Sequence, residues 1–332
     1  MAVKNQLLVY LKRVKGTWVS GELLSRRLGV SRAAIWKHIR KLKEEGYGIE
    51  ASPKKGYLLA EISDLLLPEE IRDGLSADVF GRKEIFYYRE LDSTNGKAKE
   101  LAAAGAPEGT VVIAEKQTEG RGRRGRSWFS PSADGIYVSL IIRPDIAPTE
   151  ASRITLMTAV ATAEALHSLT PLEIRIKWPN DILVNGSKIG GILTEISAEM
   201  DVVHFIVIGL GLNVNMPLET FPHEIRERAT SVFINMGEQF SRVNIVRAYL
   251  EWYEKYYEIF KKIGFKPVIQ RWKEFSDIVG QQVLVDIMKK KYFGKVVDVD
   301  DDGALILQDD QKKLRRIFSG DIILNDPAKT PS

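Results

Sequence analysis

The residues best suited to chemistry lie in a glycine- and arginine-rich segment near the middle of the chain. From Gln117 to Phe129 the sequence reads Gln-Thr-Glu-Gly-Arg-Gly-Arg-Arg-Gly-Arg-Ser-Trp-Phe, with three glycines among four arginines. Glycine exposes backbone N–H groups, and arginine binds phosphate oxygens through two parallel hydrogen bonds. The segment is therefore predicted to hold a phosphate, especially that of a nucleotide. The competing interpretation is a basic loop that binds DNA non-specifically.

The pattern Gly120-x-Gly122-x-x-Gly125 also matches the fingerprint of dinucleotide-binding folds. That fingerprint requires a helix directly after the glycines and an acidic residue about twenty positions later. Here a β-like run follows at residues 136–143, and the expected acidic position falls in a turn around Pro144. The sequence contains neither a Walker A motif nor the catalytic motifs of protein kinases. We therefore interpret the match as fortuitous.

Two further segments place polar side chains beside glycines. The segment Lys177-Trp-Pro-Asn-Asp181 is followed by Lys188, which leads directly into Gly190-Gly191. Glycines inside a strand allow a ligand to approach the backbone closely. The run from Gly209 to Asn215 ends an apolar strand and contains Asn213, whose side-chain amide can hydrogen-bond the edge of a base.

The elements that must position these residues are predicted from apolar periodicity and from capping residues. The run Asp92-Ser93-Thr94-Asn95 is well suited to cap a helix that ends near Gly105. A long helix is expected from Glu150 to about Leu169, and Asn185-Gly186 predicts a hairpin turn. Strands are expected at residues 84–91, 110–115, 136–143 and 204–210. Grouped strands with helices between the groups indicate an α+β sheet covered by helices on one side.

The first part of the chain has the pattern of a helix-turn-helix. Ser20 and Ser31 are suitable caps for a second and a third helix, and Gly29 lies in the short turn between them. The residues expected to face inward are Leu7, Leu8, Leu11 and Val14 in the first helix, Leu23, Leu24 and Leu28 in the second, and Ile35, Ile39 and Leu42 in the third.

The outward face of the third helix is basic, and a hairpin follows it. Two β-like runs, residues 47–51 and 57–60, flank a turn with two lysines at its tip, which resembles the wing of a winged helix. We expect the third helix to enter the major groove of DNA, whereas the competing interpretation is a small solvated helical bundle. The residues expected to contact DNA are Ser31, Arg32, Ala33, Trp36, Lys37, Arg40, Lys54 and Lys55.

Charge and composition agree with this division. Residues 1–65 contain 13 Lys and Arg against 6 Asp and Glu, although the net charge of all 332 residues is only +4. A basic module ahead of a slightly acidic body indicates a polyanionic partner for the first part only. The chain has no cysteine and no apolar run of the ~20 residues that a membrane span needs. A cytoplasmic location without membrane attachment is expected.

The order of these segments resembles that in biotin–protein ligases. Ser93-Thr94-Asn95, the loop of residues 120–129, the segment 177–181 with Lys188, and the run 209–215 follow one another as in that family. With the basic module, the chain resembles the bifunctional class of biotin ligase and biotin-operon repressor. The resemblance implies a multidomain α+β protein with three parts. These are a winged helix-turn-helix domain (residues 1–65), a central mixed sheet of the biotin/lipoate ligase type (residues 66–277) and a small SH3-like β-barrel (residues 278–326).

The resemblance also implies the reaction and its partners. Biotin and ATP would form biotinyl-5′-AMP and pyrophosphate, with Mg²⁺ accompanying ATP, and the biotinyl group would then pass to a lysine of the biotin carboxyl carrier protein. The same adenylate would act as co-repressor, favouring a homodimer that binds operator DNA. Neither chemical step needs a nucleophile from the enzyme, in keeping with a chain that lacks cysteine.

Residue roles follow from the resemblance alone. Arg121 and Lys188 are the expected catalytic residues, which hold the biotin carboxylate and the α-phosphate. The other residues expected to bind ligand are Ser93, Thr94, Asn95, Gln117, Gly122, Arg123, Trp128 and Asn213. Ser93, Thr94 and Gln117 would contact the ureido ring with Arg123 beside them, Trp128 would pack on adenine, and Asn213 would bind its edge. Asp181 is a candidate Mg²⁺ ligand or a turn-capping residue, and the stretch from Asn215 to Arg228 receives no assignment.

Two other functions remain open on the sequence. A winged-helix repressor could sense a small ligand without catalysis, and a lipoate ligase would share the architecture and the carboxylate chemistry. Near the C-terminus, Asp298-x-Asp300-x-Asp302-Gly303 imitates the start of a calcium-binding loop, but strand-like flanks favour a hairpin turn. The aromatic residues at helical spacing between Asn244 and Gly264 are interpreted as a packing surface.

Overall fold

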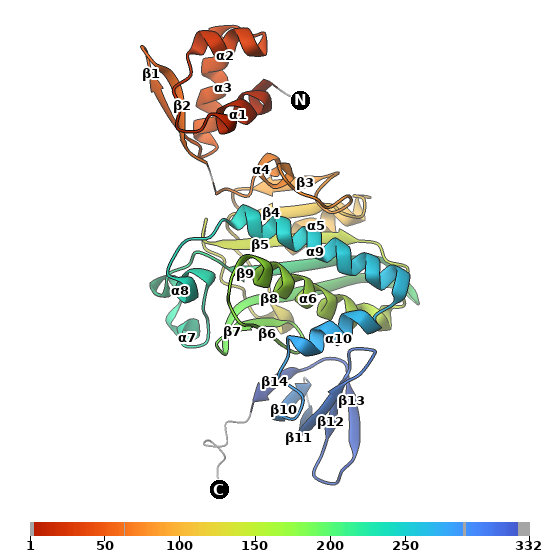
Figure 1. Cartoon of the computed structure of the whole chain (residues 1–332). Helices are drawn as coiled ribbons and strands as arrows, with labels where there is room; N and C mark the ends of the chain where they lie inside the picture. The colour runs from red at the N-terminus through yellow and green to blue at the C-terminus, as the bar shows by residue number, and fades with distance from the viewer. Residues whose placement is uncertain (1–2, 63, 288–289, 325–332) are drawn as a thin grey trace. The chain divides into compact units, whose positions relative to one another are not determined.

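The structure is a computed structural model that describes residues 3–62, 64–287 and 290–324. It forms two compact units, one up to Glu70 and the other from Ile71 onward, and helix α4 (Pro68–Arg72) spans the division (Figure 1). The predicted boundary at residue 65 lies close to this division. Within the described residues, no helix is both long enough and apolar enough to cross a membrane.

The first unit is a helix-turn-helix followed by a hairpin, as predicted. Ser20 and Ser31 cap their helices through hydrogen bonds from the N–H groups of Leu23 and Ala34, and Gly29 ends the second helix in the left-handed conformation with φ of 66°. The elements are α1 (Val3–Arg13), α2 (Gly21–Leu28), α3 (Arg32–Glu44), β1 (Gly48–Ser52) and β2 (Gly56–Glu61), and the two strands pair antiparallel.

Seven of the ten residues predicted to face inward are buried, Val14 and Leu28 are half-buried, and Leu23 is an exception. Leu24 and Ile35 are fully buried, whereas the side chain of Leu23 is 47% exposed, so the inward orientation expected for it was wrong. Successive residues of a helix differ by about 100° in direction, and Leu24 takes the place that faces the core.

The second unit is built on a seven-stranded mixed sheet. β3 and β4 pair in parallel and the other neighbouring strands pair antiparallel, which confirms the mixed sheet expected from the sequence. In sheet order the strands are β3 (Ile85–Tyr88), β4 (Val111–Ala114), β5 (Gly135–Ile142), β9 (Val202–Asn213), β8 (Ser187–Glu199), β7 (Asp181–Val184) and β6 (Ile174–Lys177).

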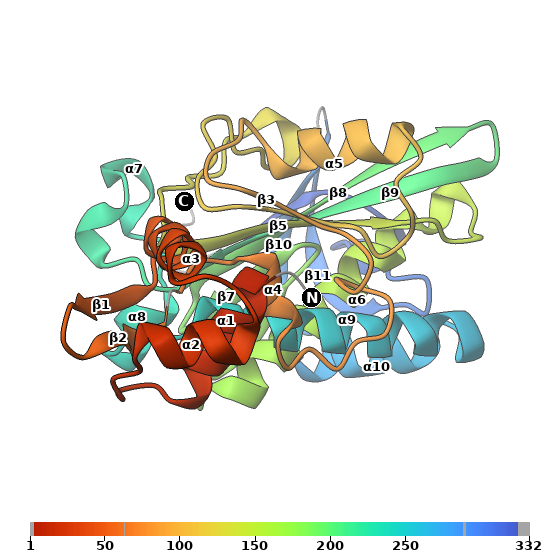
Figure 2. The same cartoon turned by 90° about the horizontal axis from the view of Figure 1, so that it is seen from above.

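Helices cover both faces of this sheet, so the expected one-sided cover was wrong. Every residue of β5 is buried, and a strand buried on both faces needs packing partners on both. Ala98 and Ala102 of α5 pack on Val112, Ile141 and Val207 on one face, and Figure 2 shows α9 and α10 on the other. The larger helices are α5 (Thr94–Ala103), α6 (Ala151–Leu169), α9 (Arg242–Ile263) and α10 (Lys266–Glu274), and the shorter ones are α7 (His223–Arg226) and α8 (Val232–Met236). Single 3₁₀ turns occur at η1 (Arg123–Gly125), η2 (Pro148–Glu150) and η3 (Leu218–Thr220).

The aromatic residues of α9 form a packing surface, as predicted. Tyr249, Tyr253 and Tyr257 are buried, and the rings of Tyr253 and Tyr257 lie edge-on to Phe80 with centroids 4.9 and 5.7 Å away.

The C-terminal part of this unit is a five-stranded antiparallel sheet. In sheet order its strands are β13 (Leu314–Ile317), β12 (Leu305–Gln308), β11 (Lys290–Val299), β10 (Gln282–Ile287) and β14 (Asp321–Leu324). An antiparallel sheet agrees with the small β domain expected here, while its closure into a barrel stays a prediction.

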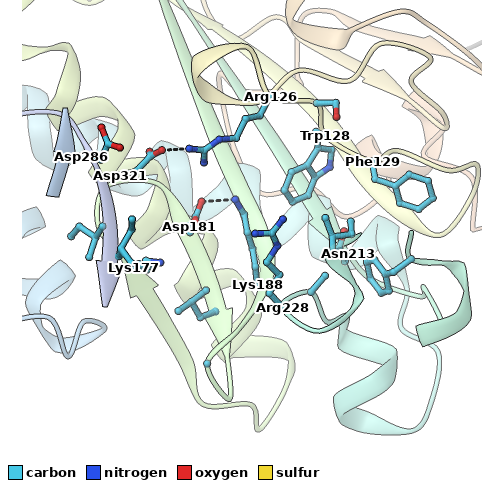
Figure 3. A pocket seen from close by; sticks show the side chains of 18 residues that line it. Arg126, Trp128, Phe129, Lys177, Asp181, Lys188, Asn213, Arg228, Asp286 and Asp321 are labelled. Carbon is cyan, nitrogen blue, oxygen red and sulfur yellow. Dashed lines mark hydrogen bonds and ion pairs between the residues drawn. The ribbon is translucent and has the colours of Figure 1, made fainter. Parts of the chain in front are cut away.

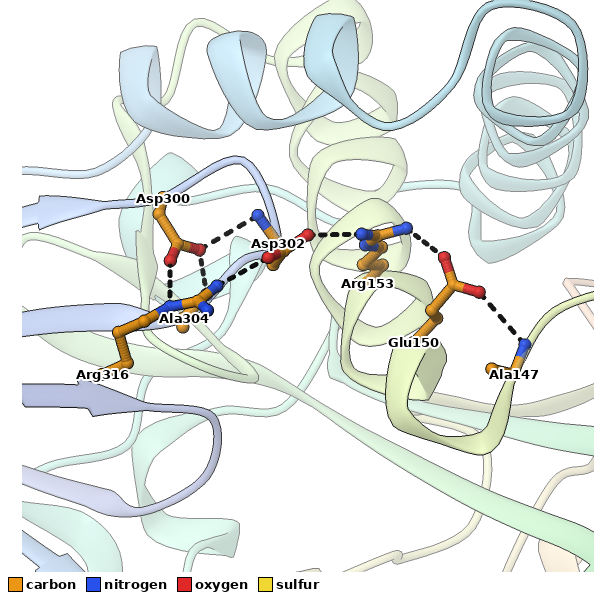
Figure 4. Close-up of polar contacts among 7 residues, drawn as sticks. All are labelled: Ala147, Glu150, Arg153, Asp300, Asp302, Ala304 and Arg316. Carbon is orange, nitrogen blue, oxygen red and sulfur yellow. Dashed lines mark hydrogen bonds and ion pairs between the residues drawn. The ribbon is translucent and has the colours of Figure 1, made fainter. Parts of the chain in front are cut away.

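The aspartates that imitate a calcium loop form a hairpin turn between β11 and β12. The Asp300 carboxylate accepts hydrogen bonds from the N–H groups of Asp302 and Ala304, both at 3.0 Å. Arg316 pairs with Asp300 and Asp302, and Arg153 of α6 also pairs with Asp302, which ties the sheet to α6 (Figure 4). The antiparallel pairing of β11 with β12 confirms the hairpin interpretation.

A buried ion pair connects α9 to the central sheet. Arg242 Nη1 donates to Glu115 Oε2 at 2.8 Å and to the Gly135 carbonyl oxygen at 3.0 Å, and the two side chains are only 1% and 3% exposed. Removing one partner of such a pair leaves an uncompensated buried charge, which is strongly destabilising.

We predict that Arg242→Met lowers the free energy of unfolding by about 3–5 kcal/mol. Urea denaturation followed by circular dichroism measures the change. The matched control is Lys262→Met on the same helix, because Lys262 is 74% exposed where it pairs with Glu258. A surface pair of this kind contributes about 0–1 kcal/mol. Equal stability of the two variants would contradict a structural role for the buried pair.

Candidate active site

Two neighbouring cavities lie beside the glycine-rich strands β8 and β9. The larger has a volume of about 710 Å³ and the smaller a volume of about 50 Å³. Trp128 and Lys188 line both cavities, so these two side chains form the border between them. A ligand that extended through both would pass between an indole ring and an ammonium group.

The strands beneath this site need glycine because the ring of Trp128 lies directly on their backbone. A Cβ atom on Gly211 would lie 2.4 Å from Trp128 Nε1, and one on Gly191 would lie 3.1 Å from Trp128 Cζ3. Gly191 and Gly211 are cross-strand partners, so together they form a flat area under the ring. Within the described residues, the buried Trp128 Nε1 has no hydrogen-bond partner. The ring is thus positioned by packing on the glycines rather than by a hydrogen bond from its own N–H group.

The wall of the smaller cavity is a set of oriented hydrogen-bonding groups. Gln117 Oε1 accepts from the Thr94 backbone N–H at 2.9 Å and from Thr94 Oγ1 at 3.1 Å, and Gln117 Nε2 donates to Ser130 Oγ at 2.9 Å. Ser93 caps α5 by accepting from the Gly96 N–H. The structure therefore brings together the predicted residues Ser93, Thr94 and Gln117 at the start of α5.

Asn95 also lines this cavity, but its side chain is used within the protein. Its Nδ2 donates to the Leu193 carbonyl oxygen at 3.2 Å and to Glu195 Oε2 at 2.9 Å, and its Oδ1 accepts from Ser139 at 2.6 Å. A Cβ atom on Gly209 would lie 2.2 Å from that Oδ1. These contacts fix the start of α5 on the sheet, and the predicted ligand contact of Asn95 stays a prediction.

Lys188 is held at the border of the cavities from two sides. Its Nζ lies 2.6 Å from Asp181 Oδ1 and 5.3 Å from the centroid of the Trp128 ring. Its backbone N–H donates to the Arg228 carbonyl oxygen at 2.8 Å, and its carbonyl accepts from the Thr230 N–H at 2.9 Å. Because backbone and ammonium group are both fixed, the positive charge is positioned by the protein itself.

The larger cavity has charged walls. Figure 3 shows Arg126, Lys177 and Arg228 among its lining residues together with Asp181 and Asp321. A cavity of about 710 Å³ lies within the range of ~300–1,000 Å³ that is typical of small-molecule sites. Four cationic side chains (Arg126, Lys177, Lys188 and Arg228) line it against three aspartates (Asp181, Asp286 and Asp321), and arginine in particular suits an anionic ligand such as a nucleotide.

Asn213 lies in this larger cavity and is buried. Its Nδ2 donates to the Thr230 carbonyl oxygen at 2.9 Å. The amide nitrogen of Asn213 is thus already bonded to Thr230, and the predicted contact of Asn213 with a base edge stays a prediction.

The segment after Asn215 contributes residues that the sequence analysis left unassigned. Phe221, Ile225, Arg228 and Ala229 line the larger cavity, and Phe221 is buried. The segment is placed by the backbone pairing of residues 228–230 with Lys188. The i, i+4 spacing of Phe221 and Ile225 was the available signal, but a run this short does not reveal its partner. Lys177 and Arg126 are two further lining residues to which no role was assigned.

The four arginines of the glycine-rich loop have different surroundings. Arg121 lines the smaller cavity, and its guanidinium has no partner within the described segments of the chain. Arg123 bonds Asn180 Oδ1 at 2.8 Å and Ser319 Oγ at 2.9 Å. Burial lowers the pKa of the Arg123 guanidinium, and the negative charge of Asp321 opposes this shift. The predicted position of Arg123 beside a ligand ring stays a prediction, because its donors already have partners.

The segment from Lys177 to Asp181 connects the site to the rest of the unit. Trp178 is 2% exposed, and its Nε1 donates to the Gly303 carbonyl oxygen of the C-terminal sheet at 3.2 Å. Asn180 Nδ2 donates to the Ile192 carbonyl oxygen at 3.1 Å on β8. Asp181 pairs with Lys188. Asn180 also accepts from Arg123, and of all these contacts only the pair of Asp181 with Lys188 lies at the border of the two cavities.

The predicted DNA-contacting stripe is exposed on α3. Trp36 is 56% exposed, and the Arg40 guanidinium carbon lies 5.2 Å from its ring centroid. At the tip of the hairpin, Lys55 Nζ lies 5.6 Å from the ring centroid of Trp18. The exposed residues of the stripe and hairpin are Arg32, Ala33, Trp36, Lys37, Arg40, Lys54 and Lys55. Ser31 acts as the cap of α3, and contact of these residues with DNA stays a prediction.

Three family models match the chain in succession. Residues 3–58 match a family described as "HTH domain". Residues 87–213 match the "Biotin/lipoate A/B protein ligase family", and residues 278–325 match the "Biotin protein ligase C terminal domain".

Curated relatives and a solved structure are similar to this chain over most of their own lengths. The chain is 39% identical over 322 residues to the bifunctional ligase/repressor BirA of Bacillus spizizenii, which covers 97% of this chain and 98% of that protein. It is 32% identical over 299 residues to the protein of the same name from Escherichia coli, covering 89% of each. The biotin protein ligase from Aquifex aeolicus in complex with biotin and ATP superposes with a TM-score of 0.63 at 28% identity, covering 73% of this chain and 99% of that one.

We predict that Gly211→Ala displaces Trp128 and lowers the free energy of unfolding by about 1–3 kcal/mol, the usual result of overpacking. Calorimetry and tryptophan fluorescence measure the effect. The control is Gly96→Ala in α5, whose Cβ would lie 3.6 Å from its nearest neighbour, Ser93 Cβ. Alanine there favours the helix by up to about 1 kcal/mol. A Gly211→Ala protein with wild-type stability and fluorescence would show that Trp128 does not lie on the strand.

Proposed function

The chain belongs to the bifunctional biotin–protein ligase and repressor family, and on this premise we propose that it activates biotin with ATP, transfers the biotinyl group to a carrier lysine and represses transcription from operator DNA. Its similarity to the BirA proteins runs along almost the entire chain. The observation that carries the chemical proposal is the border formed by Lys188 and Trp128 between two cavities. The smaller would receive biotin and the larger the nucleotide.

The reaction explains why the site needs positive charge rather than a nucleophile. A carboxylate oxygen of biotin attacks the α-phosphorus of ATP, the bond to the bridging oxygen breaks, and pyrophosphate leaves with the electron pair. The lysine amine of the carrier then attacks the carbonyl carbon, loses a proton and displaces AMP. In the first step two anions approach each other, so fixed cations at their meeting point lower the barrier.

Lys188 and Arg121 are proposed to supply these cations. The ammonium group of Lys188 lies at the border of the cavities, and Arg121 lines the smaller cavity with its guanidinium without a partner in the described chain. Asp181 holds Lys188 in place through the 2.6 Å ion pair. Both cations can therefore act on the carboxylate and the α-phosphate, as the family resemblance implies.

Biotin binding requires the smaller cavity to widen. At about 50 Å³ it is well below the ~300 Å³ at which small-molecule pockets begin. Thr94 and Gln117 are hydrogen-bonded to each other, so a ureido ring with Ser93 beside it would bind by exchanging some of these bonds for its own donors and acceptors. We infer that the side chain of Arg121, which has no partner in the described chain, swings aside when biotin enters, since it lines this cavity on its loop side.

The nucleotide is proposed to lie in the larger cavity. Trp128 offers a ring face to adenine, and the buried Asn213 lies nearby with an oxygen that can accept from its amino group. Phe221 and Ile225 provide apolar surface, while Lys177, Arg126 and Arg228 provide cations for phosphates.

The described residues do not form a cage for Mg²⁺. Asp181 is the proposed carboxylate ligand, but it pairs with Lys188, and no cluster of acidic residues or histidines in the described parts could hold a metal ion. Mg²⁺ is commonly held by substrate phosphates with only one or two carboxylates. We therefore propose that the ion accompanies ATP, and no step is assigned to it.

Repression is proposed to depend on the exposed stripe of α3 and the lysines of the hairpin. Trp36 can make apolar contacts in the major groove, while Lys37 and Arg40 can contact phosphates or guanine edges. Biotinyl-5′-AMP would favour a homodimer, whose two helix-turn-helix units bind two half-sites. Because the proposed operator and the proposed carrier protein are both cytoplasmic, we propose that this protein acts in the cytoplasm.

We predict that the purified protein exchanges pyrophosphate into ATP only when biotin is present. Lys188→Met and Arg121→Ala should each lower this exchange by roughly 100-fold or more, the usual effect of removing one charge-stabilising group. Lys262→Met, on the distant surface of α9, should retain wild-type exchange.

The choice of acid in the same assay separates the alternatives. Exchange with lipoate but not with biotin would identify a lipoate ligase. Tight biotin binding without exchange would identify a ligand-sensing repressor and contradict the proposed activity.

We also predict that Lys37→Ala weakens binding to DNA from the promoter of the host's biotin synthesis genes while leaving exchange intact. Loss of one phosphate contact should reduce the slope of log affinity against log salt by about 1. Electrophoretic mobility shifts with biotin and ATP present measure this. Lys15→Ala, after α1, is the control, and an equal loss in both variants would show only a general effect of charge.

A further inference from the structure

Three arginines of the glycine-rich loop, Arg123, Arg124 and Arg126, have hydrogen-bond or ion-pair partners in the C-terminal part of the chain. Arg124 Nη2 donates to the Asp286 carbonyl oxygen at 2.7 Å, and its Nη1 lies 3.3 Å from Asp321 Oδ2. Arg126 pairs with the same Asp321 oxygen, and Arg123 bonds Ser319. We call the residues Arg124, Arg126, Asp286 and Asp321 the loop clamp. Figure 3 shows its pair Arg126 and Asp321 at the wall of the larger cavity.

The backbone of Arg124 needs an external contact to hold it. Arg124 has φ of 57°, in the left-handed region that residues with a side chain rarely adopt. Such a conformation persists only when surrounding contacts determine it. Its guanidinium finds such contacts on Asp286 and Asp321, so the clamp acts at the non-glycine residue of the loop that has a positive φ.

The loop backbone connects the clamp to the residues proposed to bind ligand. Gly122 N–H donates to the Arg126 carbonyl oxygen at 2.7 Å, and Trp128 N–H donates to the Gly120 carbonyl oxygen at 2.8 Å. Arg121 and Ser127 are paired across the same short loop. Fixing Arg124 and Arg126 therefore fixes Arg121 and Trp128 on either side of them.

The clamp is not needed to attach the C-terminal sheet. Arg153 of α6 pairs with Asp302, and Trp178 Nε1 donates to the Gly303 carbonyl oxygen at 3.2 Å. Figure 4 shows the first of these attachments, and neither Arg153 nor Asp302 lines the two cavities of the site. Since the sheet has this separate attachment, the side chains of Asp286 and Asp321 can act mainly on the loop.

We propose that Asp321, supported by Asp286, is a positioning residue for adenylate formation: the C-terminal sheet holds the glycine-rich loop through its arginines, so that Arg121 and Trp128 occupy their places before ATP binds. This inference rests on the proposed ligase function. It makes the C-terminal sheet part of the machinery of the first reaction step, although no residue of the clamp contacts the reacting atoms.

The decisive variant is Asp321→Asn in the full chain, compared with Asp302→Asn as the matched control. Asp321 and Asp302 both belong to the C-terminal part of the chain, and each pairs with two arginines. Both substitutions replace the carboxylate with an amide. If only a tenth of the molecules keep the loop in place, the apparent affinity for ATP falls by that fraction. In Asp321→Asn the KM for ATP in biotin-dependent exchange should therefore rise roughly tenfold, with kcat at saturating ATP changed less than about twofold. Asp302→Asn should keep the wild-type KM.

Limited digestion with trypsin reports on the loop without any activity. Trypsin cleaves after arginine, so release of the clamp should speed cleavage between residues 121 and 126 by roughly the same tenfold factor, since proteolysis follows the open population. Biotin with ATP should suppress the excess cleavage, and Asp321→Glu should restore the wild-type rate.

Several outcomes would contradict the role proposed for the loop clamp. Wild-type KM and cleavage in Asp321→Asn would show that Asp321 does not position the loop, and equal effects in Asp302→Asn would show that only attachment of the sheet matters. If Asp321→Asn does not fold, Arg124→Gln tests the clamp from the other side, because Arg124 pairs with Asp321 and lines neither cavity. A wild-type protein without exchange would contradict the ligase function, whereas the trypsin comparison would still decide whether the clamp exists.

Discussion

Two negatively charged groups must meet in this protein, and the site is arranged around that electrostatic constraint. A carboxylate and an α-phosphate repel each other unless fixed cations stand where they meet. Lys188 is the cation proposed for this position, and its place is fixed because it lies at the start of β8, residues 228–230 pair with its backbone, and Asp181 orients its ammonium group. The cation is thus in place without spending binding energy on its orientation, which is the general advantage of a preorganised site.

The same constraint explains the unusual residues around Lys188. Trp128 can lie on β8 and β9 only because Gly191 and Gly211 have no side chains. The loop that carries Trp128 and Arg121 is rich in glycine and arginine, which bind phosphates well but give a loop little packing of its own. Its remaining arginines are bonded to the C-terminal sheet. A sheet far along the chain therefore completes a site whose motifs lie in the central part.

Local patterns were sufficient for many elements and insufficient for a few. Ser20, Ser31 and Gly29 cap helices as expected, because capping depends on neighbouring residues only. The orientation of Leu23 and the second covered face of the central sheet were not predicted correctly, because both depend on which other element packs there. The stretch around Phe221 had no recognisable motif, since its role arises from pairing with Lys188, more than thirty residues earlier.

The sequence by itself determined the three-part organisation and the family resemblance, and it predicted Lys188, Arg121, Thr94 and Gln117 as site residues, all four of which line the smaller cavity. These conclusions rest on short motifs whose residue types and order are visible in one dimension. Only the tertiary structure decided that Asn95 and Asn180 are engaged within the protein, that Lys188 and Trp128 border two cavities, and that Asp321 reaches the arginine loop. The physical reason is that side chains distant in sequence find their partners only when the sheets and loops that carry them pack together.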